Sequence, residues 1–157
     1  MNVQQHLADI AATLGLPTLE LNESGCARLL FDETIAVNFE HNEPEGKLSL
    51  YSYLGELPAG GREAFYRDML VGNLLGLQTQ GSTLGIDPEL NEVVLSRSIM
   101  IEEVSLEPFA NMLDKFVGCA EYWTQQLENS RQKGVESAPI ASEPVGFSRP
   151  MDGNLRV

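Results

Sequence analysis

The sequence has few of the residues that carry covalent or metal chemistry. Its 157 residues include two histidines and two cysteines, and neither pair has the spacing of a metal site or a redox motif. His6 is expected on the polar face of a helix and His41 in a turn, so neither is expected to act as a catalytic base or a ligand. Cys26 and Cys119 are expected to be reduced thiols of a cytosolic protein. We therefore expect no metal site.

Nucleotide-binding motifs are also missing, although four glycines lie between residues 71 and 96. A P-loop requires a lysine directly after its second glycine, and no lysine lies between Lys47 and Lys115. A dinucleotide-binding turn requires glycines that open a helix, whereas Gly72 and Gly76 come late in a predicted one. No serine stands in a G-x-S-x-G motif. Without a catalytic constellation, we expect the protein not to be an enzyme.

Basic residues and long apolar runs are scarce as well. The chain has 23 acidic and 10 basic residues, a net charge of −13 and a pI near 4.4. Such a surface repels nucleic acid and anionic membranes. No apolar run approaches the roughly 20 residues of a membrane span, and the N-terminus has Asp9 where a signal peptide would be apolar. We expect a cytoplasmic protein with no nucleic-acid partner and no membrane insertion.

The hydrophobic pattern predicts one α+β domain. Apolar residues recur at helical or alternating spacing, with turns of Gly, Pro, Asn and Asp between the segments. The order is α-β-β-β-α-β-β-α, with helices over 3–14, 62–78 and from 105, and strands over 27–31, 34–40, 48–54, 82–86 and 92–101. Short turns between strands imply an antiparallel sheet, expected to be strongly twisted, with the helices packed on it. The domain is predicted over 1–133, and the Pro- and Gly-rich segment 134–157 is predicted to be a flexible tail.

Two predicted elements have more apolar or aromatic surface than one sheet requires. In the middle helix the apolar residues cover more than one stripe: Phe65, Met69, Leu70, Leu74, Leu75 and Leu77. In the strand over 48–54, Tyr51 and Tyr53 lie on a face that is not plainly polar. These residues either fill the core or form a surface for a partner protein, and the pattern alone leaves both open.

An ordered set of short motifs resembles a known family. Leu70 and Asn73 to Gly76 form a leucine-rich helix end, Leu84 to Pro88 reads LGIDP, and Val93 to Ser96 reads VVLS. This set resembles the signature of the class I type III secretion chaperones, the Tir chaperone (CesT) family. The first helix, the strand meander and the last helix fit in the same order, so the resemblance covers about residues 1–130. The tail departs from the family pattern.

The resemblance implies a small acidic homodimer in the bacterial cytoplasm that serves virulence. It would bind the N-terminal region of a secreted effector and keep it soluble, extended and competent for export. The family has no ATPase activity and no cofactor, and the secretion ATPase is a candidate partner. A non-catalytic adaptor or regulator of the same fold remains an alternative. A small ligand-binding α+β domain is another, but it would need a pocket with convergent polar groups, and the sequence shows no such set.

The resemblance also suggests two sets of site residues. The first helix and the sheet would receive the effector through Val3, Leu7, Ile10, Leu14, Ile35, Val37 and Phe39. The middle helix and its adjoining strand would form the dimer interface through Phe65, Met69, Leu70, Leu74, Leu75 and Ile86.

Overall fold

The element order agrees with the sequence-based prediction. The computed structural model describes residues 3–15, 19–101 and 105–136. Its helices and strands are α1 (Val3–Leu14), β1 (Cys26–Phe31), β2 (Ile35–Asn42), η1 (Glu43–Glu45), β3 (Lys47–Glu56), α2 (Arg62–Asn73), η2 (Leu74–Gly76), β4 (Thr83–Asp87), β5 (Glu92–Met100) and α3 (Leu106–Glu136). The predicted α+β class is therefore confirmed.

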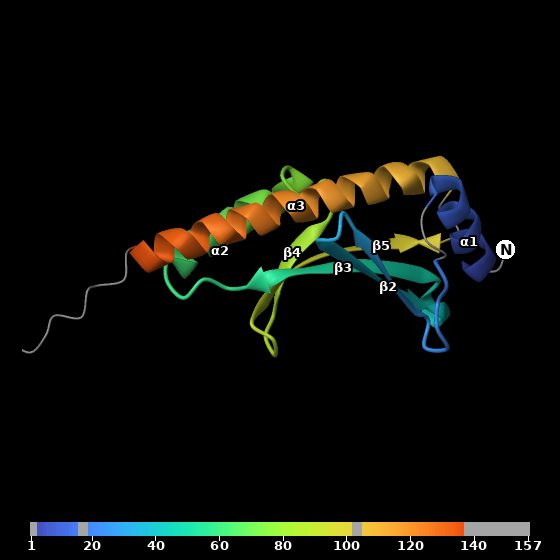
Figure 1. Ribbon diagram of the computed structural model, residues 1–157, viewed down its shortest axis with the longest axis horizontal. Coiled ribbons are helices and arrows are strands. Elements are labelled where there is room, and N and C mark those ends of the chain that lie inside the picture. The colour runs from blue at the N-terminus through green and yellow to red at the C-terminus, as the bar shows by residue number, and fades with distance from the viewer. Residues whose placement is uncertain (1–2, 16–18, 102–104, 137–157) are drawn as a thin grey trace, which may run out of the picture.

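The five strands form one antiparallel sheet in the order β1-β2-β3-β5-β4. The edges of the sheet are β1 and β4. The helices gather on one face: α3 lies diagonally across the sheet, α2 runs beside it over β4, and α1 sits at the other end of α3 (Figure 1). No helix covers the opposite face among the residues that the structure describes, so that face is open to solvent (Figure 1).

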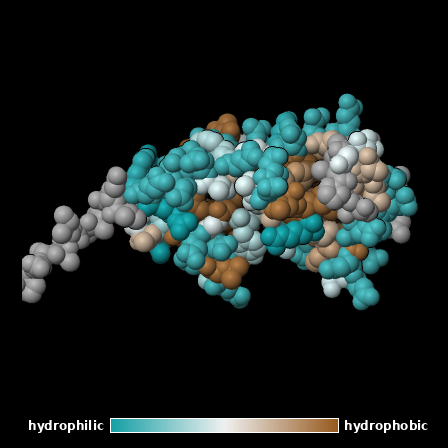
Figure 2. Space-filling model, in the orientation of Figure 1, coloured by the Kyte–Doolittle hydropathy of each residue, from teal (hydrophilic) through white to brown (hydrophobic). Residues whose placement is uncertain are grey.

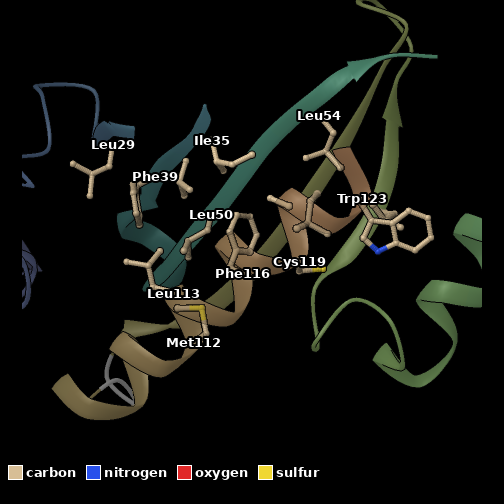
Figure 3. Packing of buried hydrophobic residues seen from close by; sticks show 14 of the residues in the cluster. Leu29, Ile35, Phe39, Leu50, Leu54, Met112, Leu113, Phe116, Cys119 and Trp123 are labelled. Atoms are coloured by element: carbon tan, nitrogen blue, oxygen red, sulfur yellow. The ribbon is translucent and has the colours of Figure 1, made fainter. Parts of the chain in front are cut away.

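The core lies between α3 and the sheet. Residues of α3 spaced three or four apart point inward, which is the spacing of one helical face. Phe116 lies beside Leu50, and Leu113 and Met112 lie close to them (Figure 3). Each large apolar side chain that leaves water in this way contributes roughly 1.5–3 kcal/mol. This packing fixes which face of the sheet is buried and which is left free.

Helix α2 ends at Asn73, five residues before the predicted end at 78. Leu75 has φ 54° and Gly76 has φ 68°, and this left-handed backbone cannot continue an α-helix. Leucine rarely adopts such a conformation, so the pattern of leucines in the sequence suggested a continuing helix.

Helix α3 runs through Glu136 and so passes the predicted domain boundary at 133. A side chain on Gly134 would come within 2.9 Å of the carbonyl oxygen of Gly60, which shows how closely the end of α3 approaches the loop before α2. The rest of the predicted tail, 137–157, lies outside the described residues. Residues 134–136 therefore belong to α3, and a flexible tail after them stays a prediction.

Candidate protein-interaction surfaces

Four exposed leucines lie in the last turn of α2 and in the segment that follows it. The exposed fractions are 71% for Leu70, 59% for Leu74, 91% for Leu75 and 67% for Leu77, and Ile86 on β4 is 41% exposed. We call these five residues the leucine patch. Hydrophobic side chains reach the surface beside α2, whereas the outer side of α3 is mostly hydrophilic (Figure 2). A group of large apolar side chains this exposed usually marks a protein contact.

The segment after α2, which carries Leu74, Leu75 and Leu77 of the leucine patch, is bonded to α3 through Gln78. The carbonyl oxygen of Gln78 accepts hydrogen bonds from Trp123 Nε1 at 2.9 Å and from Cys119 Sγ at 3.6 Å. Burial of Cys119 raises the pKa of its thiol to about 11, so the sulfur remains a protonated donor. Gly72 lies against the Trp123 ring, where a Cβ would be 2.4 Å from Cζ2. These contacts with Cys119 and Trp123 of α3 therefore fix the position of the segment that carries the exposed leucines.

The β4 edge of the sheet is closed at Leu84 by a side chain. Asn73 Oδ1 accepts a hydrogen bond from the Leu84 backbone N–H at 2.8 Å, and Asn73 Nδ2 donates to the Leu84 carbonyl at 3.0 Å. These two bonds have the pattern with which a neighbouring strand would pair. The amide of Asn73 therefore occupies the place of an added strand at Leu84, near the start of β4.

The β1 edge is more open. Asn22 occupies the outward groups of Cys26, because its N–H donates to the Cys26 carbonyl at 2.8 Å and its Oδ1 accepts from the Cys26 N–H at 3.0 Å. By strand alternation, the next outward backbone groups belong to Arg28 and Leu30. Nothing in the described part of the chain bonds to these groups. They form a two-residue template for another strand.

Closed, convergent sites are not evident in the described ranges. They contain no group of three or more His, Cys, Asp or Glu side chains that could hold a metal ion. Among the helices described, none is both long and apolar enough to cross a membrane. A hollow of about 840 Å³ near the start of β1 is lined mostly by polar groups, among them Glu23, Glu40 and His41. The exposed apolar surface and the sheet edges are therefore the best candidates for function.

Comparison with known proteins decides the family. The sequence matches the model of the Tir chaperone protein (CesT) family over residues 5–124. The chain belongs to this family. The resemblance to the type III secretion chaperones is thereby confirmed, and so is the predicted chaperone class.

Relatives of this CesT-family chaperone include a protein of Chlamydia pneumoniae, 30% identical over 132 residues, which are 83% of this chain and 99% of that protein. The transcriptional anti-antiactivator ExsC of Pseudomonas aeruginosa is 30% identical over 125 residues, 80% of this chain and 85% of the relative. In the solved ExsC–ExsE complex, the matching chain has a TM-score of 0.65 at 29% identity and covers 80% of this chain and 92% of its own length. The Yersinia pestis type III secretion chaperone SycH, solved with a fragment of YscM2, shares the fold at 21% identity, with a TM-score of 0.62 and coverage of 77% and 98%.

The structure divides the predicted dimer residues of this chaperone into two groups. Leu70, Leu74, Leu75 and Ile86 belong to the leucine patch and are available to a partner. Phe65 and Met69 are 3% and 5% exposed and lie in the core beneath α2. Helical spacing identifies apolar positions but does not say which of them the protomer's own α3 already covers.

The predicted effector-binding residues lie in the core wherever the structure describes their side chains. Those buried residues are Leu7, Ile10, Ile35, Val37 and Phe39, none of them more than 6% exposed. The side chains of Val3 and Leu14 lie outside what the structure describes. In this conformation the five buried side chains cannot touch an effector, because they lie in the core between the sheet and the helices.

Proposed function

We propose that this chaperone works as a homodimer in the bacterial cytoplasm and binds the N-terminal segment of a secreted effector without catalysing a reaction. The observation that carries the dimer is the leucine patch, in which Leu75 is 91% exposed although its loop is fixed to α3. Burying such a surface between two copies would contribute roughly 25 cal/mol per Å² before the costs of association. The type III secretion ATPase is proposed as a further partner on the family likeness alone.

The dimer is tested by sedimentation of Leu75→Asp. Wild type should have twice the mass of the 17.2 kDa chain, and the variant should be monomeric at micromolar concentration because a carboxylate would be buried in the interface. Leu90→Asp is the matched control, since Leu90 is 56% exposed but lies in the β4–β5 turn. A monomeric wild type, or a dimer that survives Leu75→Asp, would contradict the proposal.

For the effector, we propose that an extended segment pairs with the β1 edge at Arg28 and Leu30. The support is the contrast between the two edges: Asn73 occupies the outward groups of Leu84 on the short strand β4, while the outward groups of both Arg28 and Leu30 have no partner in the described chain. The segment would gain backbone hydrogen bonds there and would remain extended, as export requires.

Two substitutions of Leu30 distinguish pairing through the backbone from contact through the side chain. Leu30→Pro removes an outward N–H without breaking the β1–β2 ladder, whereas Leu30→Ala keeps the N–H and removes the side chain. Co-expression followed by affinity purification and mass spectrometry identifies the effector, and calorimetry then compares the variants. Leu30→Pro should lose at least 10-fold in affinity and Leu30→Ala much less. Equal losses would place the contact in the side chain instead.

A second candidate function is that of a regulator. The relative ExsC is named a transcriptional anti-antiactivator and is 30% identical to this chain. A chaperone that also binds a regulatory protein would report on secretion, since the effector and the regulator would compete for it. The test is to offer the purified chaperone to lysate of its source cells with and without the effector. A regulatory protein that is captured and then displaced by the effector supports this candidate, and capture unaffected by the effector contradicts it.

A further inference from the structure

The helix-free face of the sheet carries an exposed pair of tyrosines at its centre. Tyr51 and Tyr53 on β3 point away from α3, because Leu50, Ser52 and Leu54 alternate with them and are buried. The two rings meet edge to face, with centroids 6.0 Å apart and planes at 86°. Tyr53 is 41% exposed. The pair therefore places aromatic surface at the centre of the helix-free face.

The neighbouring strands leave a hollow beside these rings. The hollow has a volume of about 570 Å³ and is bounded by both tyrosines, Gly85, Val94 and Ser96. Gly85 pairs with Val94 on this face and has no atom within 4 Å of where a side chain would begin. Small residues therefore surround the rings, and the surface is accessible to an extended chain.

The rim of the hollow is negative. Glu40 and Glu89 border it. Glu92 pairs with Asp87 at its end, and Asp87 Oδ2 accepts a hydrogen bond from the Tyr53 hydroxyl at 3.1 Å. Hydrogen bonds from the backbone of Leu90 and Glu89 lower the pKa of Asp87, so its carboxylate stays charged.

Positive charge on the same face is sparse. Lys47, at the start of β3, is paired with Glu45 at 2.7 Å. Arg28 lies on the β1 edge in the same cross-strand row as Tyr51, with Asn38 between them, so this arginine already lies near one end of the face. In the described part of the chain, Glu40, Glu89 and Glu92 have no ion-pair partner. The face thus combines aromatic rings with uncompensated carboxylates, and both attract a cation.

We propose that this face binds an arginine-bearing extended segment of the partner protein, with a guanidinium stacked on one ring of the Tyr51–Tyr53 pair and its N–H groups directed at the carboxylates of the rim, Glu40 and Asp87. The inference rests on the proposed function for its partner. Arginine fits better than lysine, because its planar group stacks on aromatic rings and donates to carboxylates at the same time. The pKa of Tyr53 is raised, first by its hydrogen bond to Asp87, so its hydroxyl stays protonated near pH 7 and donates to that carboxylate.

The decisive experiment uses a defined probe with the full-length chain. Isothermal calorimetry measures binding of a capped peptide of alternating arginine and glycine, and of its lysine counterpart. The arginine peptide should bind several-fold more tightly. Replacing both tyrosines by alanine should weaken it at least 10-fold, while Tyr51→Phe with Tyr53→Phe should retain most of the affinity. The phenylalanine variant guards against misfolding of the alanine variant, and thermal melting checks both.

A charge-matched pair separates this face from the general attraction of an acidic protein for basic peptides. Glu40→Lys reverses a charge at the rim, and Glu121→Lys makes the same change on the exposed side of α3. Only Glu40→Lys should strongly weaken binding. Equal losses in the two variants, or binding insensitive to the tyrosines, would overturn the proposal. A tyrosine variant that becomes monomeric would also overturn it, because the face would then belong to the dimer.

The effector itself distinguishes the two proposals. If no effector is captured, the proposed function fails, and the peptide titration still decides whether the face binds arginine. If an effector binds wild type and both tyrosine variants equally, the function stands and the present inference fails.

Discussion

A single missing methyl group determines how closely α2 approaches α3. At Gly72 a Cβ would lie 2.4 Å from Trp123 Cζ2, and Trp123 is itself fixed by its bond to Gln78. Gly72→Ala should therefore destabilise the fold by about 1–3 kcal/mol, the usual cost of overpacking. Gly118→Ala is the control, because Gly118 lies within α3 with open space around it and should gain about 0.5–1 kcal/mol. Denaturant unfolding measures both, and equal effects would contradict the assignment.

The two cysteines should differ sharply in reactivity. Cys119 is buried with its pKa raised to about 11, so at pH 8 only about one molecule in a thousand carries the thiolate that reacts. Cys26 is partly exposed on the β1 edge. Mass spectrometry of alkylation at pH 8 should show Cys26 modified first, and Cys119 should react at a comparable rate only in denaturant. Fast labelling of Cys119 in the Cys26→Ser variant would show that the loop over α3 opens readily.

At the scale of the element, Asn73 joins the end of α2 to β4. Asn73→Ala should remove two hydrogen bonds from Leu84 and cost about 1–3 kcal/mol, because the Leu84 backbone groups lose their partners. Hydrogen exchange at the Leu84 amide should rise correspondingly. Asn129→Ala removes an exposed bond to Gln125 within α3 and should change little. If exchange at Leu84 stays slow in Asn73→Ala, another group closes this edge.

The element scale also shows what the sequence could and could not predict. Alternation at Ile35, Val37 and Phe39 correctly identified a strand with one apolar face. The same pattern does not show that α3 covers this face. The family resemblance, which placed these residues at the effector site, does not show it either. The end of α2 was missed for a related reason. Leu75 adopts φ 54° where the chain turns after α2. The hydrogen bonds from Asn73 to Leu84 and from Trp123 to Gln78 hold this turn, and they join residues that are distant in sequence.

For the whole molecule, a net charge of −13 and an exposed leucine patch act against each other. Mutual repulsion keeps protomers apart, so salt that screens this repulsion should favour the dimer. Sedimentation between low salt and 0.5 M NaCl should show the dimer dissociation constant falling. A constant that rises with salt would mean that ion pairs, and not apolar burial, join the two copies.

The domain boundary is a property of the whole chain, and two truncations test it. Residues 137–157 contain two acidic and two basic residues, so removing them leaves the net charge unchanged. A chain ending at Glu136 should therefore melt and dimerise like wild type, because its described contacts are intact. A chain ending at Lys133 loses the approach of Gly134 to Gly60 and should melt at a lower temperature. If the longer truncation product also melts early or loses its dimer, the segment after 136 belongs to the folded domain, and the boundary proposed here is wrong.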